Sequence, residues 1–502
     1  MGVSRDESID RRNLRFIMNT LNYKPTIGLE VHVQVKTVSK LFCGCSTEFG
    51  AEPNHNICAV CTGQPGVLPV MNKKAVEFTI RTGLALGCSI SEHSVFARKQ
   101  YFYPDLPKNY QVSQYELPLC IKGSVTLPST GKRIGITRVH LEEDAGKLLH
   151  AIGARELEYS LVDLNRTGIG LMEIVSEPDI TSADEAVEYL TTLKSILRYI
   201  DVSDCDMEKG TLRCDANISI AKPGDELGTK VEIKNMNSFK SLHTALLYEI
   251  VRQNETLSSG GKIIQETRLW DTDINETKSM RSKEFAHDYR YFPEPDLVPF
   301  KPSREWVTEI KTSLPELPLA RKSRFVKEYG LNDYDAGVLT AEKALADYFE
   351  ETVTSCVKLG LNNNDAAKPV TNWITTDLLG YLNTNKKDIS LSPVTAVNLA
   401  GLIKLLTDGT ISGKIAKTVF TEMCNTGGKP EDIVKSKGLV QISDESAILK
   451  LVIEAINENP KAVAEFKAGK ERAVFAIVGA VMKKSQGKAN PAVVNKLIKE
   501  NI

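Results

Sequence analysis

The stretch Thr26-Ile-Gly-Leu-Glu-Val-His-Val-Gln-Val35 alternates between apolar and polar side chains with a period of two. This alternation is typical of a β-strand with one buried face. The apolar face carries Leu29, Val31, Val33 and Val35, and the polar face carries Glu30, His32 and Gln34. An acid and an imidazole on one face can share a metal ion or a substrate, although a merely solvated face explains the pattern more simply. Chemistry on this strand therefore requires further ligands from elsewhere in the chain.

Length and charge narrow the possible classes of protein. The 502 residues suggest about three domains, and 63 basic residues balance 64 acidic ones. This balance argues against a protein that binds polyanions over its whole surface, so any contact with nucleic acid is expected to be local. No apolar run reaches the length of a membrane span. Residues 1–24 lack an apolar signal core, so we expect a flexible N-terminal arm on a cytoplasmic protein with reduced cysteines.

Four of the ten cysteines are clustered, as Cys43-Gly-Cys45 and, after twelve intervening residues, Cys58-Ala-Val-Cys61. Two close pairs of thiols across a short loop suit tetrahedral coordination of zinc. Four thiolates leave no open position, so the sequence predicts a structural zinc in a loop at residues 43–61. Unligated, half-buried thiols are the alternative.

Several later segments repeat the division into an apolar and a polar face. In Thr211–Ile220, the polar positions are Arg213, Asp215, Asn217 and Ser219. Such a face resembles the lining of a cleft more than an ordinary solvent face. Consecutive strands with short connections favour an antiparallel sheet. Helices over Asn72–Leu86, after the capping box Ser182-Ala-Asp-Glu185, and along Leu242, Leu246 and Ile250 are expected to support the sheet, with His243 on a helix surface.

Further candidate site residues lie in three segments. Arg98–Gln111 contains two prolines that exclude a regular helix, and it carries Lys99 and Lys108, so it forms either a site wall or a packed surface loop. Adjacent acids at 142–144, with Glu173, could complete an oxygen-rich magnesium site that takes the rest of its ligands from a nucleotide. Arg138 and Arg166 could neutralise phosphate oxygens. The chain contains no P-loop motif and no amidase-type serine motif, so ammonia, if used, must come from another protein.

The C-terminal part changes character near Pro302. Strand alternation ends there, and Thr340–Leu359 and Pro393–Met423 are expected to be helical. Gly427, Gly428 and Pro430 suggest a linker, followed by a small helical domain at residues 427–502. This tail holds 13 Lys and Arg against 9 Asp and Glu, which suits weak contact with an RNA backbone, although a solvated helical domain is equally compatible.

Several long motifs identify a resemblance. They are Ile27-Gly-Leu-Glu-Val-His-Val-Gln34, Tyr101-Phe-Tyr-Pro-Asp-Leu-Pro-Lys108, His140-Leu-Glu-Glu-Asp-Ala-Gly-Lys147, Asp163-Leu-Asn-Arg-Thr-Gly168, Leu212-Arg-Cys-Asp-Ala-Asn-Ile-Ser219 and Asp288-Tyr-Arg-Tyr-Phe-Pro-Glu-Pro-Asp296. From about Pro25 to the C-terminus, the chain resembles the B subunits of bacterial-type aspartyl/glutamyl-tRNA amidotransferases.

This resemblance implies an α+β architecture. We expect a cradle domain at residues 25–302, with an antiparallel sheet similar to glutamine synthetase, then an all-α domain at 303–426 and an all-α tail at 427–502. The family uses ATP and Mg²⁺ to phosphorylate the side-chain carboxylate of Glu-tRNA(Gln) or Asp-tRNA(Asn). Ammonia from glutamine, released by an amidase A subunit, then displaces the phosphate, which is the reaction of a carbon–nitrogen ligase. A small C subunit completes the heterotrimer.

Matched residue by residue, the resemblance places the family's magnesium ligands at His32, Glu143 and Glu173, with Glu30 close by. It places Lys99 and Lys108 along the ammonia route and the zinc at Cys43, Cys45, Cys58 and Cys61. Arg138, Arg166 and Arg213 are candidates for contact with ATP phosphates. One departure is visible, because this chain has Gly168-Ile-Gly170-Leu where the family usually has Gly-x-Pro-Leu. Glycine loosens what proline would fix, so Glu173 is the least secure assignment.

Three alternative interpretations compete with that of an amidotransferase B subunit. A non-catalytic tRNA-binding scaffold in the same complex would leave Glu30 and His32 solvated. An aminoacyl-tRNA synthetase is suggested only by Lys278-Ser-Met-Arg-Ser-Lys283, without a companion nucleotide motif. The archaeal E-type relative carries a large insertion for which the helical C-terminal part leaves no room.

Overall fold

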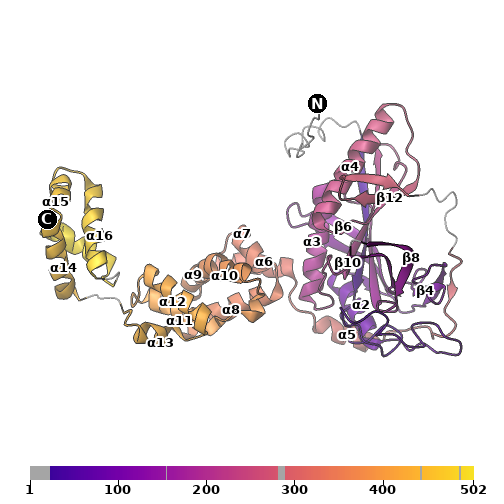
Figure 1. The fold of residues 1–502 in the computed structure, drawn as a ribbon, viewed down its shortest axis with the longest axis horizontal. Helices are drawn as coiled ribbons and strands as arrows, with labels where there is room; N and C mark the ends of the chain where they lie inside the picture. Colours follow the sequence, from indigo (N-terminus) through magenta and orange to yellow (C-terminus); the bar gives the residue numbers. More distant parts are fainter. Residues whose placement is uncertain (1–22, 154, 281–288, 441–443, 486–487) are drawn as a thin grey trace. The chain divides into compact units, whose positions relative to one another are not determined.

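The computed structural model describes residues 23–153, 155–280, 289–440, 444–485 and 488–502. Most of the expected N-terminal arm therefore lies outside the described residues. The chain divides into two compact units, one that ends at Leu317 and one that spans Pro318–Ile502. The first is built on a β-sheet and the second is helical (Figure 1).

The opening stretch forms β1 (Lys24–Gln34), which lies inside a sheet of nine strands within the described residues. The order across the sheet is β13 (Glu276–Ser279), β12 (Glu266–Asp271), β11 (Val231–Lys234), β10 (Leu212–Ala221), β1, β9 (Gly170–Ser176), β6 (Arg133–Glu143), β5 (Cys120–Thr126) and β2 (Ser89–Ile90). All described neighbours pair antiparallel except β11 and β12, which are parallel. The expected antiparallel sheet is therefore confirmed with one exception.

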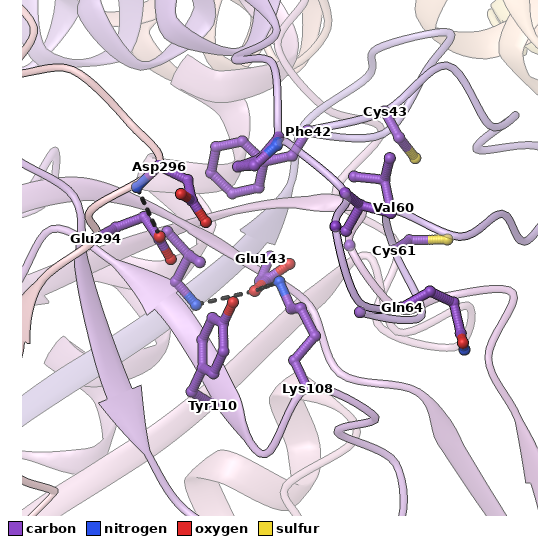
Figure 2. A pocket seen from close by; sticks show the side chains of 16 residues that line it. Phe42, Cys43, Val60, Cys61, Gln64, Lys108, Tyr110, Glu143, Glu294 and Asp296 are labelled. Atoms are coloured by element: carbon purple, nitrogen blue, oxygen red, sulfur yellow. Dashed lines mark hydrogen bonds and ion pairs between the residues drawn. The ribbon is translucent and has the colours of Figure 1, made fainter.

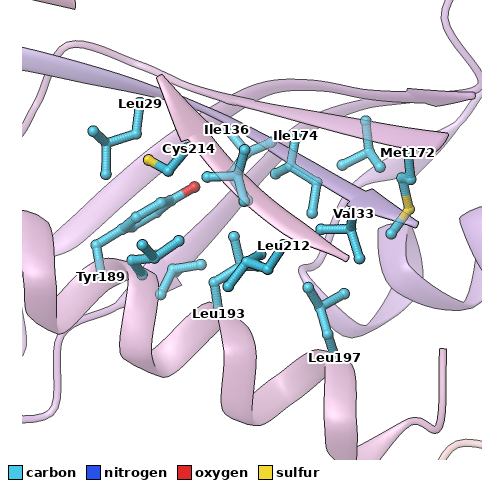
Figure 3. Packing of buried hydrophobic residues seen from close by; sticks show 14 of the residues in the cluster. Leu29, Val33, Ile136, Met172, Ile174, Tyr189, Leu193, Leu197, Leu212 and Cys214 are labelled. Carbon is cyan, nitrogen blue, oxygen red and sulfur yellow. The ribbon is translucent and has the colours of Figure 1, made fainter. Parts of the chain in front are cut away.

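Three helices bury the apolar face of this sheet: α2 (Lys73–Ala85), α3 (Ala183–Tyr199) and α4 (Phe239–Ser258). Helix α3 begins as the capping box predicts, because the Ser182 hydroxyl accepts a hydrogen bond of 3.1 Å from the Glu185 amide. Its leucines point at the sheet, where Leu193 and Leu197 face Val33 and Leu212 (Figure 3). This packing leaves the opposite face of the sheet to the polar side chains.

Two smaller sheets belong to the same unit. One contains β14 (Phe292–Pro293), β3 (Ala97–Gln100) and β4 (Tyr110–Ser113), and the other is a hairpin of β7 (Lys147–Ile152) and β8 (Arg155–Asp163). Helix α5 (Arg304–Thr312) also joins this unit, since Ile310 is buried in its core. The boundary between the units therefore falls after Leu317 and not at Pro302.

In the second unit, the described residues form two separate hydrophobic cores. The first is formed by α6 (Pro318–Tyr329), α7 (Asp333–Leu339), α8 (Lys343–Lys358), α9 (Asn363–Asn372), a π-helical turn (Trp373–Leu378), α10 (Leu379–Thr384), a 3₁₀ turn (Ile389–Leu391), α11 (Ala396–Thr407), α12 (Gly413–Thr426) and α13 (Pro430–Ser436). The second is formed by α14 (Glu445–Glu458), α15 (Pro460–Lys467), a 3₁₀ turn (Glu471–Ala473), α16 (Val474–Lys484) and α17 (Pro491–Asn501).

These helices agree with the predicted ranges, with one shift at the tail. Gly427 ends α12 with a φ of 68°, but the helix that follows packs into the first core through Ile433 and Val434. The core of the tail therefore starts at Ile448 and not directly after the glycines. In the part of the chain that the structure describes, no helix is long and apolar enough to cross a membrane.

Candidate active site

His32 lies at the centre of the polar face of the large sheet. In the register of β1, it is opposite Glu173 on β9 and opposite Arg213 on β10. Strand β6 continues the row on the other side of β9, where His140 is opposite Glu173. The pairing of strands thus gathers residues that are far apart in the sequence.

His32, Glu142 and Glu173 form a group that we call the carboxylate–imidazole cluster. Their ligand atoms lie within 4.8 Å of one another. The His32 Nε2 atom is 3.4 Å from the nearer oxygen of Glu173 and 3.8 Å from that of Glu142. Burial and the adjacent Glu173 carboxylate raise the pKa of Glu142 to about 7. Two crowded, buried carboxylates with an imidazole fit a divalent cation, which would relieve their repulsion.

The pKa values of two histidines in this region shift in opposite directions. Burial alone would lower the pKa of His32, but Glu173 and Glu142 raise it above its ordinary value. Burial lowers the pKa of His140 to about 4, so this imidazole is neutral at pH 7. Among the described residues, the His140 Nδ1 atom has no hydrogen-bond partner. The neutral imidazole, 3.8 Å from a Glu173 oxygen, therefore adds little charge to the cluster.

Glu143, which the family resemblance suggested as a ligand, lies apart from this cluster. Its carboxylate forms an ion pair with Lys108 and accepts a hydrogen bond of 2.9 Å from the Val112 amide. The structure instead brings its neighbour Glu142 to the cluster. The alternation of side chains along β6 could have indicated Glu142, because this residue is two positions from His140 and lies on the same face of the strand. Glu30 lies on the same face as His32, but its carboxylate accepts a hydrogen bond from Asn217.

The glycines before Glu173 do not loosen its strand. Gly168 has a φ of 81°, and its amide donates to the Asp144 carbonyl. Gly170 begins β9, where its carbonyl accepts a hydrogen bond of 3.0 Å from the Val35 amide. A Cβ atom at Gly170 would lie only 2.7 Å from a methyl carbon of Val35. Close packing against Val35, the residue after β1, thus fixes this segment where the family usually has proline.

The three candidate arginines have different partners. Arg138 lies 3.4 Å from a Glu173 oxygen, and Arg166 donates to the backbone carbonyls of Ala145 and Gly146. Arg213 forms an ion pair of 2.8 Å with Asp144. Burial opposes the charge of Asp144, but Arg213 and Arg166 hold its pKa below the ordinary value. Of the three arginines, only Arg213 is among the residues that line the cavity beside the cluster.

Glu142 and Glu143 line different cavities. The larger, of about 430 Å³, is lined by His32 and Glu142 and also by Lys99, Arg213 and Lys234. The smaller, of about 220 Å³, is lined by Glu143, Lys108 and part of the cysteine loop. Figure 2 shows Lys108 and Tyr110 pointing toward Glu143 in this smaller cavity. The two candidate lysines therefore belong to different cavities.

The four clustered cysteines also converge. Their sulfur atoms lie within 4.8 Å of one another, and those of Cys58 and Cys61 are 4.0 Å apart. Tetrahedral zinc–sulfur bonds of about 2.3 Å place ligand sulfurs about 3.8 Å apart. The donor set and its spacing thus fit a structural zinc ion.

The loop between the cysteine pairs is anchored to the segment that follows β8. Asn54 donates to the Asp163 side chain and to the Val162 carbonyl, and it accepts from the Leu164 amide at 2.8 Å. The Asn56 amide donates to the Asn165 side chain at 2.8 Å. These bonds connect the cysteine loop to the motif that precedes Glu173.

Comparisons with known proteins identify the family of this chain. A family model described as the GatB/GatE catalytic domain matches residues 25–308, and one described as the GatB domain matches residues 347–502. Relatives named as the B subunit of aspartyl/glutamyl-tRNA(Asn/Gln) amidotransferase occur in Carboxydothermus hydrogenoformans and Brevibacillus brevis, each 55% identical. The first alignment covers 96% of this chain and 99% of the relative, and the second covers 95% and 98%. A relative of the same name from Geobacter sulfurreducens is 54% identical over 96% of this chain and its own entire length. The chain therefore belongs to the family of aspartyl/glutamyl-tRNA(Asn/Gln) amidotransferase B subunits.

Proposed function

We propose that this chain is the B subunit of a glutamine-dependent ligase that converts Glu-tRNA(Gln), Asp-tRNA(Asn) or both into the amidated forms. Membership of the family and the names of its relatives support this proposal. In the proposed complex, an amidase A subunit releases ammonia from glutamine, and a small C subunit joins the amidase to this chain. The complex would work in the cytoplasm, where these tRNAs are used. We also propose that the sheet unit has a fold similar to that of glutamine synthetase.

The proposed chemistry begins with activation of a carboxylate. Ammonia does not displace oxygen from a carboxylate at neutral pH, so the side chain of the esterified amino acid must first gain a leaving group. Transfer of the ATP γ-phosphate to that oxygen provides one, and attack by ammonia then releases phosphate and leaves the amide. Phosphoryl transfer depends mainly on positioning and on neutralisation of charge.

The single observation that carries this proposal is the carboxylate–imidazole cluster beside a cavity with cationic walls. His32, Glu142 and Glu173 would hold magnesium, which when bound neutralises phosphate oxygens. On the cavity wall, Arg213 is oriented by Asp144 and Lys234 by Asp215, the latter at 2.6 Å. These fixed cations can position phosphate groups without the cost of ordering flexible side chains.

An ammonia route past the Glu142–Glu143 pair is part of the proposal. Lys108 and Glu143 line the smaller cavity, and Lys99 lines the larger one. Gln111 connects the two, because it lines the larger cavity and donates to the Glu143 carbonyl at 2.8 Å. A route within the protein keeps ammonia from being protonated and the acyl phosphate from meeting water.

The remaining parts of the chain have supporting roles in the proposal. The four cysteines would bind a structural zinc that fixes the loop beside the smaller cavity. The tail would contact the tRNA backbone, which is consistent with its 13 basic residues against 9 acidic ones.

The proposal is tested by reconstitution with the amidase and the small third component, and by measurement of ATP turnover and amidation on misacylated tRNA. His32→Ala should lower both rates at least about 100-fold, because even outer partners of metal ligands typically contribute 10–100-fold. His243→Ala is the matched control, since this imidazole lies on helix α4 and pairs with Asp184 at 3.0 Å. We expect the control to keep the wild-type rates.

A second measurement replaces glutamine with an ammonium salt, so that the amidase step is bypassed. The loss in His32→Ala should persist under this condition, because the defect lies in activation and not in ammonia supply. Unchanged ATP turnover in His32→Ala would instead favour a non-catalytic scaffold that only binds tRNA.

A further inference from the structure

A stack of aromatic rings lies next to the carboxylate–imidazole cluster. The rings of Tyr115 and Tyr291 are nearly parallel, with centroids 4.8 Å apart and planes inclined by 13°. Tyr289 contacts Tyr291 edge to face, at a centroid distance of 6.2 Å. Tyr291 comes from the segment 289–296, which is remote in sequence from Tyr115.

The segment that carries Tyr291 is firmly attached to the sheet unit. Arg98 on β3 donates two hydrogen bonds of 2.7 Å to the buried carboxylate of Glu294. Strands β3 and β14 also pair directly, with Phe292 opposite Arg98. A bidentate arginine–carboxylate pair fixes orientation as well as distance. Tyr291 is therefore held at a defined position against Tyr115.

Arg138 continues the stack toward the cluster. Its guanidinium carbon lies 5.0 Å from the centroid of the Tyr115 ring, within the range of a cation–π contact. Its terminal nitrogen lies 3.4 Å from Glu173 Oε1, while His32 lies 3.4 Å from Glu173 Oε2. Each oxygen of Glu173 thus has its own partner, which sets the rotation of the carboxylate.

Hydrogen bonds alone do not hold Arg138 in this position. Its Nε atom is buried and has no hydrogen-bond partner in the described part of the chain. The ring of Tyr115 therefore supports the guanidinium group beside its contact with Glu173. An arginine side chain without such support regains rotamer freedom and loses its fixed geometry.

We infer that Tyr115, backed by Tyr291, is a positioning residue that acts through Arg138 to orient Glu173 for metal binding. This inference rests on the proposed function, in which Glu173 is a metal ligand. It also assigns Arg138 to the carboxylate and not to a phosphate. Outer partners that orient a ligand typically change metal affinity or activity by 10–100-fold.

The test measures Mn²⁺ affinity of the purified chain by calorimetry or electron paramagnetic resonance. Tyr115→Ala should weaken binding about 10-fold, whereas Tyr115→Phe, which keeps the ring, should stay within about twofold of wild type. Tyr115 is 48% exposed, so its removal opens no cavity in the core. Tyr291→Ala removes the ring that stacks on Tyr115, so this variant should also weaken Mn²⁺ binding.

A double-mutant cycle separates positioning from general damage. Arg138→Ala should weaken Mn²⁺ binding, and Tyr115→Ala should have no further effect in its presence, because Tyr115 acts through Arg138. Tyr334→Ala is the control, since this tyrosine is exposed on helix α7 of the helical unit. The Mn²⁺ affinity of this control variant should match that of the wild-type chain.

The outcomes distinguish the inference from the proposed function. Loss of binding in His32→Ala together with wild-type affinity in Tyr115→Ala would overturn the inference and leave the proposed metal site intact. Additive effects of Tyr115→Ala and Arg138→Ala, or equal losses in Tyr115→Ala and Tyr115→Phe, would also overturn it. Failure of the wild-type chain to bind Mn²⁺ would overturn the metal site and the inference together.

Discussion

Glu142 and Glu143 are adjacent glutamates that the sheet turns in opposite directions. Burial and the Glu173 carboxylate raise the pKa of Glu142 to about 7, so without a cation about half of these carboxyl groups carry a proton at pH 7. Glu143 instead has Lys108 as its ion-pair partner and the Val112 amide as a donor. At the scale of single residues, strand alternation separates a candidate metal ligand from a candidate residue of the ammonia route.

Replacing each glutamate by glutamine gives a matched pair of variants. Glu142→Gln removes a charge from the cluster and should lower Mn²⁺ affinity by about 10- to 100-fold. Glu143→Gln should leave the affinity within about threefold of wild type, because its side chain lies outside the cluster. Calorimetric titration of the purified variants checks both values. The reverse order of affinities would place the metal with Glu143.

The sequence singles out His32 and Glu173, which the structure brings together, but it gives no choice between the two glutamates at 142 and 143. Glu142, Glu143 and Asp144 are consecutive acids, so composition alone gives no reason to prefer one. The choice depends on the register between β6 and β9, which places His140 opposite Glu173. A register between strands so distant in sequence is a tertiary property, so the motif resemblance points to Glu143 while the structure groups Glu142 with His32 and Glu173.

At the scale of elements, the cysteine loop connects a candidate metal site to a β-hairpin. Asn54 and Asn56 contribute hydrogen bonds to Val162, Asp163, Leu164 and Asn165, where β8 leads toward the Glu173 strand. Among the described residues, no third strand joins the hairpin of β7 and β8, and isolated hairpins are only marginally stable. The hydrogen bonds from the cysteine loop therefore help to stabilise this hairpin.

A double variant, Cys58→Ser with Cys61→Ser, tests this connection. The wild-type chain should contain about one zinc ion, and the double variant should lose it. Amide hydrogen exchange at residues 155–165 should become faster in the variant, because the anchoring hydrogen bonds depend on the folded loop. Metal analysis and exchange mass spectrometry measure the two effects.

Asn54→Ala is the companion variant. It should keep the zinc but still accelerate exchange at residues 162–164, since it removes the anchoring side chain and spares the thiols. The prediction would be contradicted if the folded wild-type chain contained no zinc and amide exchange stayed slow in both variants.

The starts of helices were predicted correctly where the sequence shows recognisable capping residues. Ser182 and Glu185 make the capping interaction that their spacing predicts, and Asn490 accepts from the first amides of α17. The glycines near 427 ended α12 as expected, but the sequence did not reveal that α13 packs back onto the same core. Local residues specify where a helix ends, whereas the next helix's partner depends on distant apolar contacts.

At the scale of the whole chain, the sheet unit includes a helix that lies beyond the change in composition. Helix α5 buries Ile310 in the core of this unit, and Trp306 packs against the same core. The strand pattern ends before this helix, so the sequence placed the boundary too early. A boundary is a property of the core and not of the local secondary structure.

Two truncated chains test this boundary. A chain that ends at Leu317 should unfold cooperatively, whereas one that ends at Pro302 should be less stable by at least about 2 kcal/mol, since burying one such apolar side chain contributes about 1.5–3 kcal/mol. Urea denaturation followed by circular dichroism gives the two free energies of unfolding. Equal stability of both chains would return the boundary to Pro302.

The central position of β1 has a consequence for synthesis. Its neighbours, β9 and β10, end at Ser176 and Ala221, so β1 is translated well before both of its partners. At 5–20 residues per second, this delay is on the order of 10 s. For most of that time neither β9 nor helix α3, which covers the apolar face of β1, has been synthesised, and sheets with such non-local pairings fold slowly. The nascent chain is therefore most prone to aggregation before the ribosome has released Ala221, and that interval is when a chaperone is most needed.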